Sequence, residues 1–82
     1  MTAYQVLKKY GWIQGNSGSY TNGFCLMGAI YEAYSAEYGK IASAKARVEA
    51  LLPKRYSSPI VWNDVKSRKK SEVLALVKKA RV

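Results

Sequence analysis

The chain has 82 residues and a formal net charge of +9 at pH 7, with 49% hydrophobic residues, one cysteine and no histidine. This length predicts one domain, and a single cysteine excludes an internal disulfide. No run of about 18 apolar residues exists, which excludes a transmembrane helix, and the N-terminus lacks the pattern of a secretory signal. We therefore expect one domain over residues 1–82, cytoplasmic and without contact to a membrane.

Positive charge is concentrated in the C-terminal part of the chain. Residues 54–82 contain nine Lys and Arg against two acidic residues, whereas residues 1–53 contain five against three. Such a basic half predicts an acidic partner, either an acidic protein surface or nucleic acid.

The first predicted helix begins after Thr2 and ends near Tyr10. Thr2 and Gln5 have the spacing of a capping box, and Gly11 suits the residue that ends a helix. Residues 11–23 are rich in Gly, Asn and Ser, which predicts a loop. A short hairpin is the alternative, with residues 12–14 paired to residues 19–21.

Residues 24–38 are predicted to form the central helix, which Gly39 would end. Apolar side chains occupy most of its circumference, as in a helix that other helices cover. One stripe of this helix consists of large side chains, namely Phe24, Met27, Tyr31, Tyr34 and Tyr38. The tyrosine edge, Tyr34 and Tyr38, is the part we expect at the surface, where it is a candidate contact for a protein partner or for a homodimer.

Two further helices complete the predicted fold. The first is amphipathic from Ile41 to Leu52 and ends at Pro53. Residues 60–64 form either one helical turn or an extended segment that docks Trp62. The last helix begins near Ser71 and carries its apolar stripe from Val73 to Ala80. The predicted fold is therefore all-α, with four helices around one core.

Catalytic chemistry finds little support in the residue types present. Cys25 precedes a helix, where a thiol can be activated, but without histidine no Cys–His or Ser–His pair can form within the chain. The few carboxylates are not spaced as a catalytic pair, and no phosphate-binding glycine motif is present. We expect no enzyme, no metal site and no cofactor, with Cys25 as a core residue.

Candidate binding residues are basic or aromatic. Lys and Arg neutralise phosphates or carboxylates, and Tyr stacks on bases or guanidinium groups. The basic candidates lie in two clusters, residues 54–56 and 66–70: Lys54, Arg55, Tyr56, Lys66, Arg68, Lys69 and Lys70. Candidate protein contacts are Trp12, Tyr20, Tyr34 and Tyr38. The alternative is that the basic residues form a solvated surface without a partner.

Four short motifs occur in order: Trp-x-Gln-Gly at 12–15, Cys-x-x-Gly-Ala-Ile at 25–30, Trp-Asn-Asp at 62–64, and Glu-Val-x-x-Leu-Val-x-x-Ala at 72–80. On these motifs the chain resembles a group of small uncharacterised bacterial and phage proteins. It departs from their pattern at Lys69, where a Thr is common, so that its 66–70 cluster is unusually basic. The resemblance implies a compact helical fold and a phage or mobile-element origin.

The expected function is a small non-enzymatic binding protein. Its size, its basic half and the resemblance suggest a phage-type accessory protein that inhibits or modulates a host macromolecule, for example a defence complex. One alternative is a nucleic-acid-binding protein that contacts phosphates through the 54–56 and 66–70 clusters. Another is an enzyme that uses Cys25.

Overall fold

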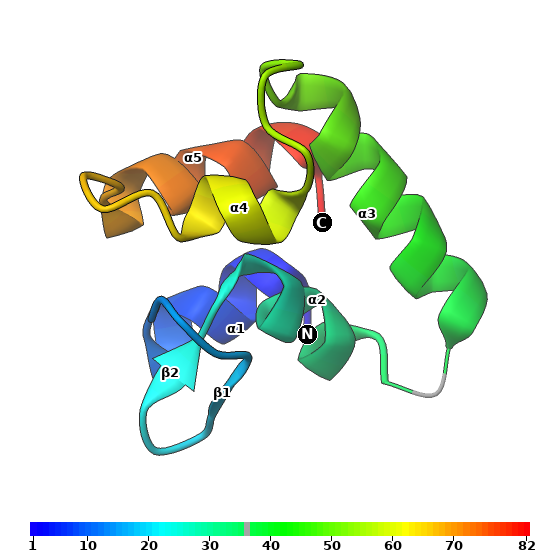
Figure 1. Cartoon of the computed structure of the whole chain (residues 1–82). Coiled ribbons are helices and arrows are strands. Elements are labelled where there is room, and N and C mark those ends of the chain that lie inside the picture. Colours follow the sequence, from blue (N-terminus) through cyan, green and yellow to red (C-terminus); the bar gives the residue numbers. More distant parts are fainter. Residues whose placement is uncertain (36) are drawn as a thin grey trace.

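A computed structural model describes residues 1–35 and 37–82 of the chain, and Ala36 lies outside the described residues. The elements follow in the order α1 (Ala3–Tyr10), β1 (Gly18–Ser19), β2 (Gly23–Phe24), α2 (Leu26–Ala33), α3 (Tyr38–Leu51), α4 (Pro59–Asn63) and α5 (Lys70–Ala80) (Figure 1). The all-α prediction is confirmed in part, because the described residues are mostly helical but include a two-stranded hairpin. They contain five helices, where the sequence predicted four and left residues 60–64 as either a helical turn or an extended segment.

Helix α1 is capped as its sequence predicts. The Thr2 hydroxyl accepts from the Gln5 amide at 3.1 Å, and the Gln5 side chain accepts from the Thr2 amide at 2.9 Å. At the other end, the Gly11 amide donates to the Leu7 carbonyl at 3.0 Å. Gly11 has a φ of 97°, which only glycine adopts without strain. Both predicted limits of this helix are confirmed.

The hairpin exists, but the predicted pairing of its strands is wrong. Gly18 pairs with Phe24 and Ser19 with Gly23, so the turn lies at residues 20–22. Residues 11–13 instead bond to Phe24: its amide donates to the Gly11 carbonyl at 3.0 Å, and the Ile13 amide donates to its carbonyl at 3.1 Å. The Ile13 amide, which lies inside the predicted strand 12–14, therefore bonds to Phe24 and not to residues 19–21.

The predicted central helix over residues 24–38 is also wrong, although part of this range, Ala36, lies outside the described residues. Helix α2 begins at Leu26, because the Cys25 side chain accepts from the Gly28 amide as its N-cap. It ends at Ala33, and α3 begins at Tyr38. Gly39 therefore lies inside α3 and does not end a helix. One continuous helix over residues 26–51 would be about 39 Å long at about 1.5 Å per residue, whereas the longest dimension of the fold is 30 Å. The break allows both segments to pack on one core.

This break divides the predicted tyrosine stripe among different elements. Phe24 lies in β2, Met27 and Tyr31 in α2, and Tyr38 in α3. Phe24 and Met27 are buried, while 51% of Tyr31 and 83% of Tyr38 are exposed. The stripe is therefore not one surface.

Helix α4 is the helical alternative predicted for residues 60–64. The Ser58 hydroxyl caps it by accepting from the Val61 amide at 3.2 Å, and Pro59 occupies its first position. At the start of α5, the Glu72 carboxylate accepts from the Lys69 amide at 2.8 Å. Lys69 is the N-cap residue, so Ser71 lies within the first turn of the helix.

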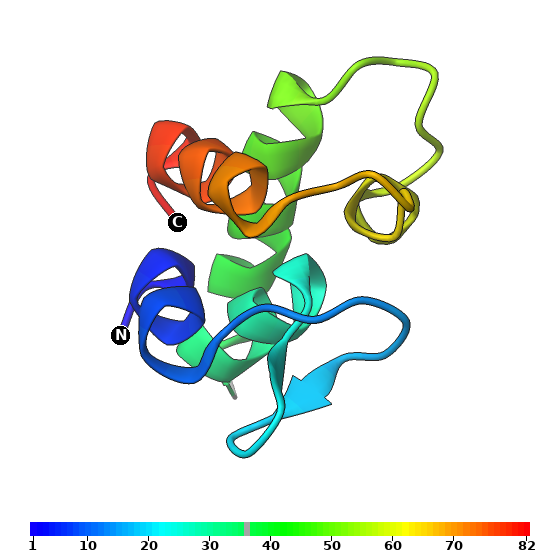
Figure 2. The same cartoon turned by 90° about the vertical axis from the view of Figure 1, so that its left-hand side faces the viewer.

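Helices α1, α2, α3 and α5 enclose the core, and α4 packs on α2 and α3. The fully buried side chains come from every one of these elements and include Val6, Leu7, Leu26, Ile30, Val48, Val73 and Val77. Helices α1 and α5 lie side by side and antiparallel (Figure 2), and the Tyr4 amide donates to the Val82 carbonyl at 3.2 Å. Within the described residues, none of the helices has the length and apolar character that crossing a membrane requires.

Candidate functional site

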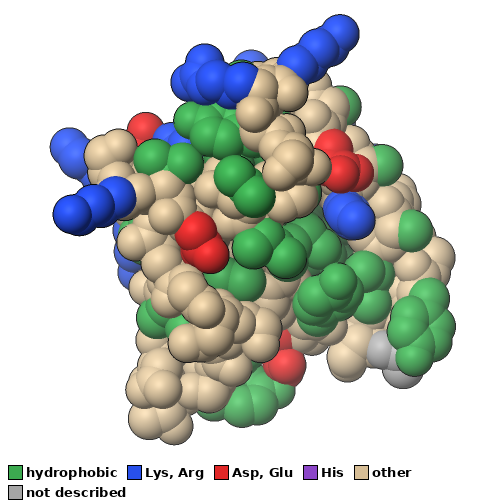
Figure 3. Space-filling model, viewed as in Figure 1, with side chains coloured by type: hydrophobic (Ala, Val, Ile, Leu, Met, Phe, Trp, Pro, Cys, Tyr) green, Lys and Arg blue, Asp and Glu red, His purple; other side chains and the backbone are tan. Residues whose placement is uncertain are grey.

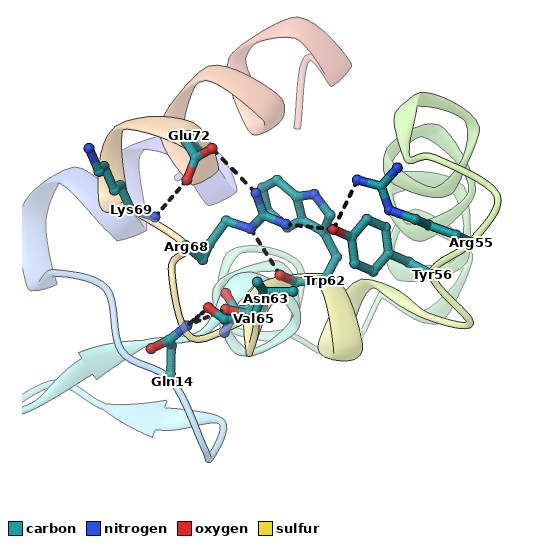
Figure 4. Close-up of polar contacts among 9 residues, drawn as sticks. All are labelled: Gln14, Arg55, Tyr56, Trp62, Asn63, Val65, Arg68, Lys69 and Glu72. Carbon is teal, nitrogen blue, oxygen red and sulfur yellow. Dashed lines mark hydrogen bonds and ion pairs between the residues drawn. The ribbon is translucent and has the colours of Figure 1, made fainter.

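The basic surface, as we name it, consists of the seven residues that the charge pattern singled out: Lys54, Arg55, Tyr56, Lys66, Arg68, Lys69 and Lys70. The first three lie in the linker between α3 and α4, and the others lie in or just after the loop between α4 and α5. The structure brings both groups together through the side chains of Arg55, Tyr56 and Arg68, shown in Figure 4.

Arg68 is the most enclosed of these residues. Its Nε donates to the Trp62 carbonyl at 3.0 Å, and its guanidinium carbon lies 3.9 Å from the centroid of the Trp62 ring. One terminal nitrogen lies 3.4 Å from the Glu72 carboxylate, and only 11% of the Arg68 side chain is exposed. Arg68 therefore fixes the α4–α5 loop and is not a freely available cation.

Tyr56 joins the two halves of the basic surface. Its phenol oxygen accepts from Nη2 of Arg55 and from Nη2 of Arg68, each at 3.4 Å. The Arg55 guanidinium also lies over the Tyr56 ring, 4.9 Å from its centroid. Because a guanidinium covers this ring, it is poorly placed to stack on a nucleic-acid base.

The same contacts change the acidity of Tyr56. Hydrogen bonds from Arg55 and then from Arg68 lower the pKa of its phenol below the usual value of 10.0, because positive donors stabilise the phenolate. The charges of the two guanidinium groups act in the same direction, and desolvation opposes them.

The four lysines of the basic surface stay exposed. Among the described residues, the two ion pairs join Glu37 to Lys40 and Glu72 to Arg68, so neither pair involves these lysines. Figure 3 shows Lys and Arg side chains standing out along the upper part of the molecule, from the α3–α4 linker to the start of α5. The surface therefore keeps its positive charge.

Helix α1 contributes two further lysines on the side of the fold that carries the basic surface, and the sequence did not indicate this. Lys8 and Lys9 are exposed in its last turn. This end of α1 lies at the same side of the fold as the start of α5 (Figures 1 and 2). The antiparallel packing of the two helices places the end of α1 that carries these lysines on the side of the fold where α5 begins.

The aromatic candidates have different environments. Trp12 and Tyr34 are half-buried, so they are at most partly available to a partner. Tyr20 is exposed and makes edge-to-face contacts with Tyr10 and Phe24, and its hydroxyl donates to Glu32. Tyr38, at the start of α3, is 83% exposed, so the tyrosine edge lies at the surface at Tyr38 but only in part at Tyr34.

Asn63 is the buried polar centre of the fold, and sequence reasoning did not single it out. Its Oδ1 accepts from the Trp12 indole at 2.6 Å and from the Leu26 amide at 3.0 Å. Its Nδ2 donates to the Ile13 carbonyl at 3.2 Å and to the Asp64 carboxylate at 2.9 Å. The Trp-Asn-Asp motif at 62–64 therefore contacts the motifs at 12–15 and at 25–30, which assigns it a structural role.

Gln14 and Gly15 complete this network. The Gln14 side chain donates to the carbonyls of Asn63 and Val65 at 2.8 and 2.7 Å, and the Gly15 amide donates to Asp64 at 3.1 Å. The Trp-x-Gln-Gly and Trp-Asn-Asp motifs thus hold one another. A sequence signal could have indicated this contact between the motifs. Each motif carries a side-chain amide close to a tryptophan, namely Gln14 after Trp12 and Asn63 after Trp62.

Cys25 lies at the N-cap of α2 and is 6% exposed. Its Sγ accepts from the Gly28 amide at 3.2 Å, and it lines a pocket of about 160 Å³ together with Met27, Tyr31, Ile60 and Asp64. The walls of the pocket offer no histidine to activate the thiol. Within residues 1–35 and 37–82, no three His, Cys, Asp or Glu side chains are grouped as metal ligands.

Comparison with curated proteins and with solved structures finds no match for this chain. A family model described as "Family of unknown function (DUF6197)" matches residues 2–82, so the chain belongs to this family.

Proposed function

We propose that this protein is a non-enzymatic binding protein that docks its basic surface on an acidic surface of another protein. The observation that carries the proposal is the position of exposed apolar side chains next to the basic linker. Ile60 and Val61 of α4 are 53% and 48% exposed and follow Arg55 and Tyr56 within a few residues. Protein–protein interfaces combine such apolar contacts with charged rims.

The space-filling view supports a protein partner. Hydrophobic side chains gather in the middle of the face that α4 shares with α2, and basic side chains surround its upper part (Figure 3). Exposed Tyr31 lies on α2 and lines the pocket with Ile60. An acidic protein with an apolar centre would complement both kinds of surface.

Binding of nucleic acid is the second candidate, because exposed lysines neutralise phosphates as well as carboxylates. Two observations make it weaker. Arg68 is held by protein groups, and the Tyr56 ring lies under the Arg55 guanidinium. The basic surface thus offers charge to a nucleic acid, while a guanidinium lies over its aromatic ring.

As part of the same proposal, binding would inhibit or modulate the partner, as expected of a phage-type accessory protein. The small size and the lack of a catalytic constellation among the described residues agree with a role exerted by occupation of a surface. Self-association through exposed Tyr38 is a separate proposal, which the oligomeric state of wild type and of Tyr38→Ala would test.

Capture of partners from a lysate of the source organism tests the proposed function. One variant reverses two charges of the basic surface, Lys69→Glu with Lys70→Glu. The matched control reverses two charges at the far end of the same helix, Lys78→Glu with Lys79→Glu. We expect wild type and the control to retain the same acidic protein, and the Lys69/Lys70 variant to lose it.

Titration with duplex and single-stranded nucleic acid completes the test. Nucleic-acid binding through several phosphate contacts would lose roughly 10³-fold or more in affinity between 50 and 200 mM salt. If nucleic acid binds in this way, and if the Lys69/Lys70 reversal weakens the binding while the control does not, the partner is a nucleic acid and not an acidic protein. Equal capture of one protein by both reversal variants would contradict the role of the basic surface.

A further inference from the structure

The phenol of Tyr56 has an unusual set of partners. Its oxygen accepts hydrogen bonds from Arg55 and Arg68, at 3.4 Å each. Among the described residues, its own O–H donates to no group. Because two donors occupy the oxygen, the O–H must point away from both guanidinium groups, where it is free to meet an external acceptor.

The charges around this phenol are unequal. Arg68 is neutralised in part by Glu72, with 3.4 Å between guanidinium and carboxylate. Arg55 is exposed, and its guanidinium has no carboxylate partner within the described residues. The adjacent Lys54 is exposed as well. A net positive charge and a free O–H therefore lie next to each other at the surface.

We propose that Arg55 and Tyr56 together bind one side-chain carboxylate, an Asp or Glu of the acidic protein partner. The inference rests on the proposed function, because it names the group that the basic surface recognises. The Arg55 guanidinium and the Tyr56 O–H are the two donors, and one carboxylate oxygen accepts from each.

The surroundings of these donors favour a protein carboxylate over a phosphate of nucleic acid. Guanidinium and phenol donors bind carboxylates and phosphates alike, so the donors themselves do not distinguish the two. The ring that a nucleic-acid base would need is covered by the Arg55 guanidinium, 4.9 Å from its centroid.

The site is also held in place before binding. The contact with Arg68 fixes Tyr56, and Arg68 is itself held by the Trp62 carbonyl and the Trp62 ring. A preformed donor loses less conformational freedom when it binds. Tyr and Arg are also the residue types that most often dominate the energy of a protein interface.

The test uses a fluorescent peptide of alternating Glu and Gly, with its affinity measured by anisotropy at low salt. Tyr56→Phe removes the O–H and keeps the ring and the charge. Arg55→Lys keeps the charge and removes the planar donors. The matched controls are Tyr4→Phe, which changes another half-buried tyrosine, and Arg81→Lys, which changes an exposed arginine at the end of α5.

We expect Tyr56→Phe to weaken peptide binding by about tenfold or more, as for loss of one hydrogen bond to a charged group. Arg55→Lys should also weaken it, because lysine lacks the rigid planar donor fork of arginine. The controls should bind like wild type. In wild type, saturation with peptide should also raise the pKa of Tyr56, because a nearby carboxylate disfavours the phenolate. Tyrosine NMR at the ring carbon that bears the hydroxyl measures this shift.

The outcomes separate the two proposals. If wild type does not bind the peptide at low salt, the proposed function fails, and the carboxylate site fails with it. If the Lys69/Lys70 reversal abolishes binding but Tyr56→Phe and Arg55→Lys bind like wild type, the basic surface stands and the carboxylate site is overturned. If Tyr56→Phe and Arg55→Lys lose affinity for a DNA duplex but not for the peptide, the carboxylate site is also overturned, in favour of a phosphate ligand.

Discussion

The Trp12 indole donates to Oδ1 of Asn63 across 2.6 Å, and this bond joins residues that are 51 positions apart. The same oxygen accepts from the Leu26 amide, so one buried side chain connects the loop after α1, the start of α2 and the end of α4. Asn63 is fully buried, and its hydrogen bonds leave neither its oxygen nor its nitrogen unpaired.

Asn63→Ala should therefore lower the free energy of unfolding by about 2–4 kcal/mol, because it leaves several buried backbone and indole groups without partners. Urea unfolding followed by tryptophan fluorescence measures the change. Asn16→Ala, in the exposed part of the same loop, is the control and should change stability little. A loss no larger than that of the control would contradict the central role of Asn63.

Gly28 and Gly39 should respond in opposite ways to the same substitution. A Cβ at Gly28 would overlap the Ser17 carbonyl, whereas a Cβ at Gly39 would meet nothing within 4 Å. Both residues lie in helices, where Ala is intrinsically preferred. We expect Gly28→Ala to destabilise the protein by about 1–3 kcal/mol. Gly39→Ala should stabilise it by about 0.5 kcal/mol.

Thermal unfolding of both glycine variants under identical conditions is the measurement. Both variants replace a glycine by alanine inside a helix, so both gain the same helix propensity. A difference in stability between them therefore reports the surroundings of the two positions. Stabilisation by both substitutions would show that the Ser17 carbonyl can move away from α2 at little cost.

Arg68→Lys should destabilise the fold although the charge is kept. A lysine cannot donate from the Nε position to the Trp62 carbonyl and at the same time reach Glu72 and Tyr56. We expect a loss of about 1–2 kcal/mol in chemical denaturation. Arg81→Lys is the matched control. Equal stability of the two variants would mean that Arg68 contributes only its charge.

Tyr56 should ionise at a lower pH than an ordinary tyrosine. Hydrogen bonds from Arg55 and Arg68 lower its pKa in the folded protein below 10.0, the value for the unfolded chain. The stabilisation from this shift is complete above the unfolded pKa and is lost as the pH falls through the folded pKa. Tyrosine NMR during a pH titration identifies the residue.

The variant Arg55→Gln removes the largest cause of this shift and should move the pKa of Tyr56 back toward 10.0. If the pKa of Tyr56 is not below 10.0 in the wild-type protein, the two guanidinium groups do not stabilise its phenolate in solution.

Local signals predicted the parts of the fold that depend on neighbouring residues. The capping box of Thr2 and Gln5 and the helix end at Gly11 involve positions at most four apart, so propensity and spacing decide them. The central helix was mispredicted because Tyr34 to Glu37 has no strong breaker. The end of α2 is set instead by how α2 and α3 share one core.

The candidate site was predictable in composition but not in arrangement. Charge and spacing named Arg55, Tyr56 and Arg68 as separate members of two clusters. That the phenol of Tyr56 meets both guanidinium groups depends on where α4 docks, which no local pattern encodes. The role of Asn63 was missed for the same reason, since its partners Trp12, Ile13 and Leu26 lie 37 to 51 positions away.

The first amide of α2 is held by a side chain from another element, and this has a consequence for local opening. Amides in the first turn of a helix usually exchange their hydrogen with water readily, because their own helix offers them no acceptor. The Leu26 amide bonds to Asn63 of α4 at 3.0 Å. Its exchange rate therefore reports how often α4 leaves α2, so one backbone amide measures the opening of the fold where its two tryptophan motifs meet.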